Sequence, residues 1–438
     1  MAVVEPWHSV TGWRCAVCGT DVSLAETEPW RCPRSTTTDR NHLLQHVLDP
    51  MAAGQPRRHP NPFVRYDSRL AWSAAAATRG MPLDARDALV IELDRRVREV
   101  DRIGFASTPF ERHDALSAAL GFNESAGVWV KRECDGVAGS QKSRHLVTIL
   151  LFLLADEMIA GRKATERPPL AIASCGNAAL AAATLASAAD WPLDVYVPTW
   201  MDAAFGRELD RLGARTQLCE RRADDPPGDP AMFRFREAVA NGAIPFTVQG
   251  PENVLCLDGG RSIGWEIAEQ FAEAQRGDDS LDAVFVQVGG GAFASSVAAG
   301  LSEVGHPVPL MAVQTAGCAP LARAWERGAT VDSVWSEVMT PWPDPASIAD
   351  GILDDETYDW IGVVGAMRQT GGQPVVALET SIEQAWHLAR RVGLNVSPTG
   401  AAGLAGLLAT LDGVDGAAWR ARQVAIVASG VQRGQSTS

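Results

Sequence analysis

The sequence predicts an α/β protein built on parallel sheets, with a ribbon-like and helical extension at its N-terminus. From Gly127 onward, short β-branched runs alternate with helices of small residues. This alternation is typical of parallel sheets whose strands are connected by crossover helices. A chain of 438 residues also exceeds the length at which a single core stops growing, so we expect more than one packed unit.

The elements are expected to form three parts. Residues 1–55 form a ribbon-like arm, residues 56–149 with 241–438 form a large domain, and residues 150–240 form a small domain. The large domain begins with a helical lead-in, where ARDALVIELDRRVREVDRIG carries apolar residues at near-helical spacing. The predicted strands of the two domains read VWVK, LAIAS, LDVYVP, VFVQV and VAIVA.

The charge and the apolar segments exclude several classes of protein. The 39 basic and 53 acidic residues give a net charge of −14, which argues against nucleic acid or an anionic membrane as the main partner. The N-terminus lacks the pattern of a secretory signal, and the apolar run 146–155 is too short to span a bilayer. We therefore expect a soluble cytoplasmic protein that acts on a small molecule.

Three of the eight cysteines lie in the N-terminal arm. Cys15 and Cys18 form a C-x2-C pair, and Cys32 follows in WRCPRS. Thiolates two residues apart can share one tetrahedral ion, so these three are candidate zinc ligands.

The fourth zinc ligand is not determined by the spacing. Ser35 stands where a second cysteine pair would need its partner, and His42 or His46 could complete the set. A ribbon that has lost its metal, or thiols that are merely buried, are the alternatives. The remaining cysteines are isolated and are expected to be reduced core thiols.

Lys142 stands at the mouth of an unusually apolar helix, in GSQKSRH followed by LVTILLFLLADEM. A poorly solvated position favours the neutral amine, which is the nucleophilic form of lysine. The alternative is an ordinary surface lysine at a helix start.

Three turns that follow predicted strands are candidate binding loops. SCGN, residues 174–177, opens a helix and suits a carboxylate, although Ser and Asn are also ordinary helix caps. GGGAF, residues 289–293, allows backbone amides to surround one phosphate and matches no dinucleotide or triphosphate fingerprint. Ser429 ends the last strand, where its hydroxyl can bond to backbone or to a ring nitrogen.

A lysine, a carboxylate loop, a monophosphate loop and a strand-end serine together are what a pyridoxal phosphate site requires. Over residues 105–435 the chain resembles the fold-type II pyridoxal-phosphate enzymes of the threonine synthase, serine/threonine dehydratase and tryptophan synthase β group. GSQKSRH, SCGNAA, GGGAF and ASGVQR resemble its successive motifs, and GGRSIGWEIAEQ and SPTGAAGLAGL resemble the segments between them.

The resemblance implies a role for each candidate residue. Lys142 forms the Schiff base with the cofactor, and Ser174, Cys175, Gly176 and Asn177 bind the substrate carboxylate. Asn177 also reaches the phenolic oxygen of the cofactor. The phosphate is held by Gly289, Gly290, Gly291, Ala292 and Phe293, and Ser429 meets the pyridine nitrogen. The resemblance further implies two three-layer parallel-sheet units, the larger of which binds the cofactor while the smaller carries the substrate loop, and a homodimer.

The reaction is the open question. VQTAGCAPLARAW and the ribbon-like arm resemble threonine synthases, whereas SIADGI at 347–352 resembles dehydratases. A neutral serine at the pyridine nitrogen favours quick loss of a β-leaving group, so we expect β-elimination or β-replacement on an amino acid, with Lys142 as the base. The alternatives are a threonine synthase-like β,γ-replacement, a racemase or epimerase that uses Lys142 and Cys175, and a catalytically silent scaffold.

The chain departs from the family pattern at five positions. Gln141 replaces Phe or His beside the ring, and Cys175 replaces a serine at the position that faces the substrate in racemases. Ser397 replaces a glutamate, and Val431 with Gln432 replaces Gly-Asn after the serine.

Overall fold

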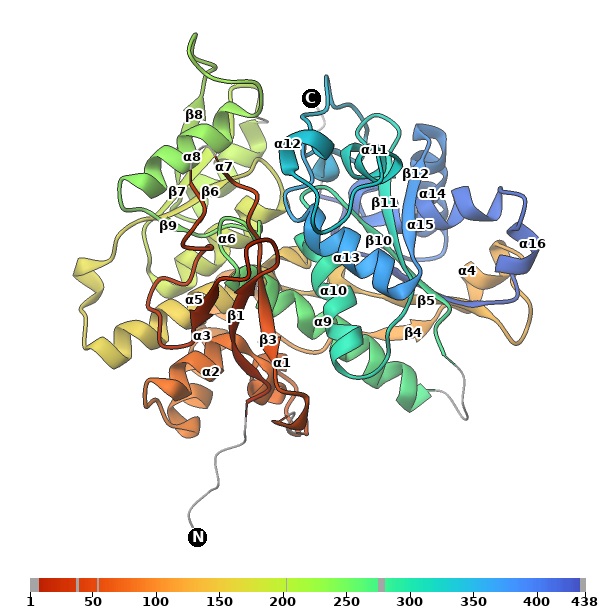
Figure 1. Cartoon of the computed structure of the whole chain (residues 1–438). Coiled ribbons are helices and arrows are strands. Elements are labelled where there is room, and N and C mark those ends of the chain that lie inside the picture. The colour runs from red at the N-terminus through yellow and green to blue at the C-terminus, as the bar shows by residue number, and fades with distance from the viewer. Residues whose placement is uncertain (1–7, 37–38, 53–54, 202, 275–279, 434–438) are drawn as a thin grey trace. The chain divides into compact units, whose positions relative to one another are not determined.

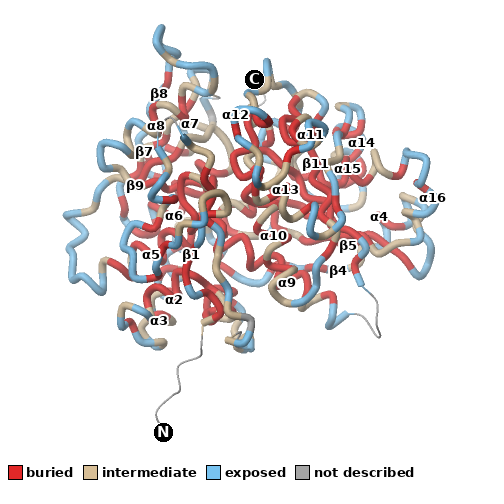
Figure 2. Tube along the Cα trace, viewed as in Figure 1, coloured by how far each residue is buried: buried red, intermediate tan, exposed pale blue. Residues whose placement is uncertain are grey.

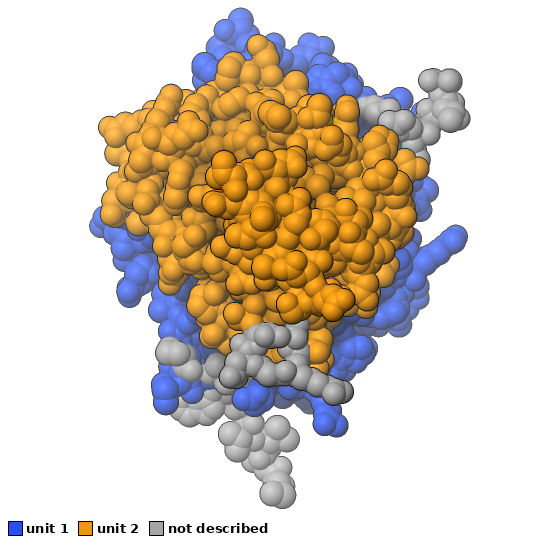
Figure 3. Space-filling view, turned by 90° about the vertical axis from the view of Figure 1, so that its right-hand side faces the viewer, with its two compact units in different colours: residues 1–107, 136–138, 142–259 blue, residues 108–135, 139–141, 260–438 orange. Residues whose placement is uncertain are grey.

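The computed structural model describes residues 8–36, 39–52, 55–201, 203–274 and 280–433. The chain separates into two compact units, which are coloured differently in Figure 3. Unit 1 consists of residues 1–107, 136–138 and 142–259, and unit 2 of residues 108–135, 139–141 and 260–438. This division differs from the predicted one, because unit 1 also takes in the N-terminal arm, the helical lead-in and the helix that starts at Lys142.

Unit 2 is organised around a six-stranded sheet in the order β12-β11-β10-β13-β5-β4. The first five strands are parallel, and β4 pairs with β5 in the antiparallel sense at the edge. The strands are β4 (Phe110–Arg112), β5 (Gly127–Lys131), β10 (Ala283–Gln287), β11 (Leu310–Thr315), β12 (Gln373–Ala377) and β13 (Gln423–Val427). The predicted α/β class with parallel sheets is confirmed.

Strands β5, β10 and β11 of this sheet are buried along their whole length, as Figure 2 shows for β5 and β11. This burial on both faces explains why the strands read as continuous apolar runs. Helix α15 packs against β10 through β13, and two of its glycines permit a close approach. A Cβ at Gly403 would meet the carbonyl of Phe285, and one at Gly406 would meet the side chain of Val313.

The remaining helices of unit 2 connect these strands or follow them. They are α4 (Asp114–Ala119), η3 (Glu133–Asp135), α10 (Ala292–Glu303), α11 (Pro320–Glu326), α12 (Trp335–Val338), η6 (Asp350–Ile352), α13 (Trp360–Thr370), α14 (Glu379–Arg391), α15 (Pro398–Leu411) and α16 (Gly416–Trp419).

Unit 1 contains a parallel sheet in the order β8-β7-β6-β9. Its strands are β6 (Leu170–Ala173), β7 (Leu193–Pro198), β8 (Arg215–Cys219) and β9 (Ile244–Pro245). Its helices are α1 (Pro62–Arg65), η2 (Asp67–Arg69), α2 (Ala71–Thr78), α3 (Leu83–Asp101), α5 (Lys142–Ala160), η5 (Ala164–Glu166), α6 (Asn177–Ala189), α7 (Ala203–Arg211) and α8 (Pro230–Ala240). Helix η4 (Val137–Gly139) and helix α9 (Leu255–Ala274) each contribute residues to both units.

Helix α5 is apolar around nearly its whole circumference because it packs against α2, α3 and α6 within unit 1 (Figure 1). Nine of the ten residues from 146 to 155 are buried, which is the pattern of a core helix. In the described part of the chain, no helix combines the length and the apolar character needed to cross a membrane.

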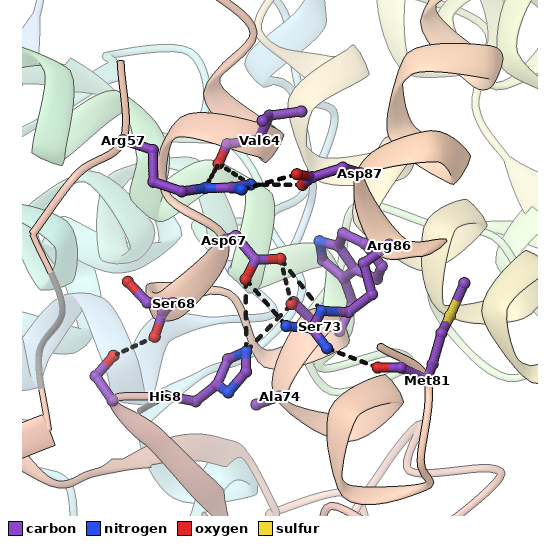
Figure 4. Close-up of polar contacts among 12 residues, drawn as sticks. His8, Arg57, Val64, Asp67, Ser68, Ser73, Ala74, Met81, Arg86 and Asp87 are labelled. Atoms are coloured by element: carbon purple, nitrogen blue, oxygen red, sulfur yellow. Dashed lines mark hydrogen bonds and ion pairs between the residues drawn. The ribbon is translucent and has the colours of Figure 1, made fainter. Parts of the chain in front are cut away.

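The N-terminal arm forms an antiparallel sheet in the order β2-β1-β3, with η1 (Pro50–Ala52) after it. Its strands are β1 (Val10–Cys15), β2 (Asp21–Ser23) and β3 (Leu44–Leu48). A buried polar cluster joins the arm to the lead-in helices (Figure 4). In this cluster the Asp67 carboxylate pairs with Arg86 at 3.3 Å, accepts a hydrogen bond from Ser73 at 2.5 Å and lies 3.7 Å from His8.

Candidate active site

Lys142 is the first residue of α5 and is half-buried. The chain turns sharply just before it, because Ala138 and Gly139 both have positive φ, at 53° and 60°. A non-glycine residue in the left-handed region costs about 1–2 kcal/mol, and such strain is typical of functional segments. This sharp turn places Lys142 at the first position of the helix.

His145 lies one turn after Lys142 on α5, on the same side of the helix. Its Nδ1 donates a hydrogen bond to the carbonyl of Cys256 at 2.7 Å, which assigns the proton of the neutral ring to Nδ1. Complete burial, together with the positive charge of Lys142, lowers the pKa of His145 to about 3. The imidazole beside the lysine is therefore neutral at physiological pH.

In unit 2, three neighbouring parallel strands end at one edge of the sheet, and each leads into a predicted site segment. Strand β10 leads to Gly289, β13 leads to Ser429, and β5 leads to residues 139–141. Carboxyl ends of parallel strands are where ligands bind in such sheets. The glycine loop, the serine and the segment that precedes the lysine thus leave the same edge.

The segment before Lys142 is hydrogen-bonded to the segment that contains Ser429. Ser140 forms a bridge with Gly430, the N–H of Gln141 donates to the carbonyl of Ser429 at 3.1 Å, and the N–H of Val431 donates to Gly139 at 2.9 Å. Lys142 is therefore the residue directly after a backbone position bonded to Ser429. This pairing also accommodates Val431, whose side chain packs against Gly139, where a Cβ would collide with it.

Gln287, at the end of β10, orients the hydroxyl of Ser429. Its buried Nε2 faces three carbonyl oxygens, those of Thr399, Gly400 and Val427, at 3.1 to 3.4 Å. Since carbonyls only accept hydrogen bonds, Nε2 must be the amide atom at this place, and it also donates to Ser429 Oγ. The serine hydroxyl accepts this bond, so its own proton remains to be donated to an acceptor such as a pyridine nitrogen.

The glycine loop is the N-terminus of helix α10, and its cap residue Gly291 has φ +98° and provides no side-chain hydrogen bond. Such a helix end favours an anion through its backbone N–H groups and its dipole. The loop is enclosed by residues 352–363: a Cβ at Gly291 would lie 3.0–3.2 Å from Thr357, Asp359 and Val363. Asp359 also donates its N–H to the carbonyl of Gly290 at 2.7 Å.

In unit 1, the predicted carboxylate loop lies at the carboxyl end of β6 and opens helix α6. Ser174 to Asn177 are all half-buried, and no side chain caps the first turn of α6. Ser174 Oγ accepts a hydrogen bond from the N–H of Gly176 at 3.2 Å, which shapes the loop. Cys175 is half-buried and forms no disulfide.

The chain has only three lysines, and the structure separates their environments. Lys131 is fully buried and donates to Glu266 at 2.5 Å and to the carbonyl of Thr108 at 2.7 Å. Lys163 is exposed, before the short helix η5. Lys142 is half-buried, and the residue directly before it, Gln141, donates its N–H to the carbonyl of Ser429.

The residues present fit pyridoxal phosphate. The uncapped end of α10 suits its single phosphate, the Ser429 hydroxyl suits its ring nitrogen, and the primary amine of Lys142 is the type of group that condenses with an aldehyde. In addition, Oε1 of Gln141 is buried, and no donor among the described residues reaches it. A buried acceptor in that state is typical of a site completed by a ligand.

Sequence reasoning missed Gln287 and the contacts around the glycine loop. Gln287 lies inside a strand motif that reads as core, and its partners come from the start of α15 and from the end of β13, both distant in the sequence. A signal for the loop contacts was present, because SIADGI leads directly into the residues that enclose Gly291. Ser397, noted as a departure, caps α15 by accepting a hydrogen bond from Gly400 at 3.0 Å.

The three candidate zinc ligands lie together in the N-terminal arm. The sulfur atoms of Cys15, Cys18 and Cys32 and a ring nitrogen of His42 all lie within 4.8 Å of one another. His46 is not part of this group.

Comparison with known proteins places the chain in a family. The family model described as pyridoxal-phosphate dependent enzyme matches residues 102–430. The chain is 26% identical to the threonine synthase of Methanosarcina acetivorans over 325 residues, which are 72% of each chain. It is 28% identical to the serine dehydratase-like protein of Mus musculus over 234 residues, which are 53% of this chain and 64% of that relative.

Solved structures agree on the fold. Diaminopropionate ammonia lyase from Escherichia coli superposes with a TM-score of 0.61 at 16% identity, covering 80% of this chain and 89% of that one. Maize serine racemase superposes with a TM-score of 0.59 at 19% identity, covering 80% and 94%. The chain therefore belongs to the family of pyridoxal-phosphate dependent enzymes, and pyridoxal phosphate is its cofactor.

Proposed function

We propose that this protein is a lyase that removes a β-substituent from a small amino acid and releases ammonia. The proposal is carried by the position of Lys142, directly after a segment hydrogen-bonded to Ser429 at the edge where the glycine loop also begins. Pyridoxal phosphate, when bound, supplies the electron sink that stabilises negative charge at the substrate α-carbon. The protein has to orient the substrate toward the cofactor and remove the proton from the substrate α-carbon.

The proton is assigned to Lys142. Its amine would hold the cofactor, and once free it would accept the α-proton of the substrate as a general base. Neutral His145 supports this role, because a second positive charge on the ring would increase the repulsion around the lysine ammonium.

The substrate carboxylate is assigned to Ser174–Asn177. The uncapped positive end of α6 and the half-buried loop favour a carboxylate at that point. A carboxylate held there limits rotation about the bond to the α-carbon, so that the bond to the proton can be aligned with the cofactor ring.

The choice of elimination is supported by the pair Gln287 and Ser429. Because Ser429 Oγ accepts from Gln287, its hydroxyl proton would be donated to the ring nitrogen of the bound cofactor, and a neutral serine would leave that nitrogen unprotonated. Pyridoxal phosphate held by a neutral serine would supply a weaker electron sink, which favours rapid loss of a β-substituent. Similarity to the serine dehydratase-like protein of mouse agrees with this choice.

Borohydride reduction of the purified holoenzyme tests the cofactor assignment. With three lysines, peptide mapping has three candidate peptides, and we expect the pyridoxyl label on Lys142 alone. Lys142→Ala should lower kcat by about 10²–10⁴-fold or more, whereas the exposed control Lys163→Arg should leave it unchanged. A protein that takes up no pyridoxal phosphate would refute the proposal and favour a silent scaffold.

A substrate panel tests the reaction. L-Serine, L-threonine and 2,3-diaminopropionate should yield a 2-oxo acid and ammonia, since loss of the β-group leaves an enamine that water hydrolyses. Phosphate release from O-phosphohomoserine without a 2-oxo acid from any member would instead identify the threonine synthase-like replacement. The homodimer implied by the family resemblance is part of the same proposal, and sedimentation of the holoenzyme tests it.

A further inference from the structure

The N-terminal arm brings four side chains with metal-binding atoms to one point. Cys15 ends β1, Cys18 lies in the turn that Gly19 closes at φ +70°, Cys32 lies in the following loop, and His42 precedes β3. Cys15, Cys32 and His42 are buried, with 1%, 2% and 7% of their surface exposed. The proposed catalytic chemistry uses none of them.

Two distances within this cluster match those that a tetrahedral ion imposes on its ligands, and all four donor atoms lie within 4.8 Å of one another. Zinc binds sulfur at about 2.3 Å and nitrogen at about 2.0–2.1 Å, so tetrahedral angles place two sulfurs about 3.8 Å apart and a sulfur and a nitrogen about 3.5 Å apart. Cys18 Sγ and Cys32 Sγ are 3.6 Å apart, and Cys15 Sγ and His42 Nδ1 are 3.4 Å apart. A disulfide would bring its sulfurs to about 2.05 Å.

The histidine is oriented as a metal ligand is. Its Nδ1 faces the sulfur of Cys15, while Nε2 lies 3.5 Å from the carboxylate of Asp39. Zinc-binding histidines usually direct their second nitrogen toward such a carboxylate, which fixes the ring. His46, the other candidate, points its Nε2 toward Asp258 at 3.7 Å and pairs with Trp13 across the sheet.

We propose that Cys15, Cys18, Cys32 and His42 bind one structural Zn²⁺ ion. Four protein ligands leave no open position for water or substrate, which is the property of a structural site. Thiolate and imidazole donors in a tetrahedral set favour zinc over calcium or magnesium, which prefer oxygen.

The ion has a specific segment to hold. Trp30 lies two residues before Cys32, its carbonyl accepts a hydrogen bond from the N–H of Val254 at 2.8 Å, and its ring contacts Phe152 of α5 with the centroids 5.8 Å apart. The zinc site therefore secures the loop that packs on α5, the helix that begins with Lys142. All of these residues belong to unit 1.

Metal analysis of the full-length holoenzyme, purified without metal-affinity resin, tests the site. We expect one zinc per chain and an X-ray absorption spectrum with three sulfurs at about 2.3 Å and one nitrogen at about 2.0 Å. A protein that contains no zinc and binds none from micromolar zinc sulfate would overturn the proposal. So would a disulfide between Cys18 and Cys32, or zinc in a shell without sulfur.

Variants assign the ligands. Cys18→Ser should lose the zinc, whereas Cys219→Ser and His46→Gln should retain it. Asp39→Asn keeps all four ligands and should weaken zinc binding by about 10–100-fold in competition with a chromophoric chelator. Retention of one zinc by Cys18→Ser, or its loss in His46→Gln, would show that the ion lies elsewhere.

A readout independent of catalysis follows from the loop contacts. Removing zinc with a chelator should release residues 19–31, so that trypsin cleaves after Arg31 in the stripped protein before it cleaves the zinc-loaded one. Equal cleavage rates in both forms would refute the structural role. The cofactor absorption of the holoenzyme is followed in parallel, so that failure of the zinc site is distinguished from failure of the proposed lyase site.

Discussion

Replacement of Gly291 by alanine is expected to weaken binding of pyridoxal phosphate more than it weakens the fold. Gly291 has φ +98°, a conformation that costs an alanine about 1–2 kcal/mol. The added Cβ would also lie 3.0 Å from Thr357 Cγ2 and 3.1 Å from Val363 Cγ2. Both distances are shorter than an unstrained contact between carbon atoms, which is about 3.5–4.0 Å. Overpacking of this kind adds about 1–3 kcal/mol, for a total of about 2 kcal/mol or more.

The variant can avoid this cost by moving the loop out of its native conformation. Binding of the phosphate must then return the loop to that conformation, so the cost reduces the free energy of cofactor binding. At 1.4 kcal/mol per tenfold change, the dissociation constant should rise at least about 30-fold. The assay is titration of the apoenzyme with pyridoxal phosphate, followed by its visible absorption, together with the thermal midpoint of each variant.

Gly305 provides the matched control. It also has a positive φ, of +78°, but a Cβ there meets nothing within 4 Å, and it lies beyond the other end of α10. Gly305→Ala should lower the thermal midpoint and leave the dissociation constant unchanged. If Gly291→Ala folds and binds the cofactor as tightly as Gly305→Ala does, the loop does not hold the phosphate and the reasoning fails.

Three further predictions concern a titrating group, the alternative reaction and a buried ion pair. Burial lowers the pKa of His145 from 6.5 to about 3, so below about pH 6.5 the unfolded chain binds a proton that the native protein does not bind. The free energy of unfolding should therefore fall as the pH drops below about 6.5, by up to about 1.4 kcal/mol per pH unit. Urea unfolding at pH 7.5 and 5.5 measures this slope, and His145→Gln should reduce it. Cys175→Ala should abolish racemisation while sparing ammonia release if the thiol acts as a second base, and chiral chromatography of the recovered amino acid would reject that base if racemisation persists. Arg86→Met leaves the Asp67 carboxylate buried without its charge partner (Figure 4) and should cost about 3–5 kcal/mol in denaturant unfolding, whereas adding Asp67→Leu should restore most of that loss; a double variant no more stable than the single one would contradict this.

The order of motifs along the chain was enough to predict the family and the α/β class, because each motif is a local pattern. Lys142 before an apolar helix, Ser174–Asn177 before an alanine-rich helix and Gly289–Gly291 after a buried strand can each be read within a few residues. The hydrophobic periods of strands and helices are local as well, so their alternation can be recognised without knowing which elements pack together.

Relations between distant residues were not readable in this way. The boundaries of the compact units depend on which surfaces α5 buries, and its apolar sequence is compatible with several partners. Gln287 orients Ser429 only because β10 and β13 are neighbours and α15 brings its carbonyls over both. The bridge between Ser140 and Gly430 joins positions 290 residues apart.

The cysteine cluster shows the same division most sharply. The C-x2-C pair identified Cys15, Cys18 and Cys32 as candidates from spacing alone, since two thiolates on one turn are a local geometry. Spacing left His42 and His46 equivalent, because no second cysteine pair follows Cys32 to fix the position of the fourth ligand. The pairing of β1 with β3 separates them: it sets His46 opposite Trp13 on the sheet, whereas His42 lies before the strand, where its ring reaches Cys15. Chain connectivity predicts which groups are near in sequence, but only the register of the folded strands determines which of them meet.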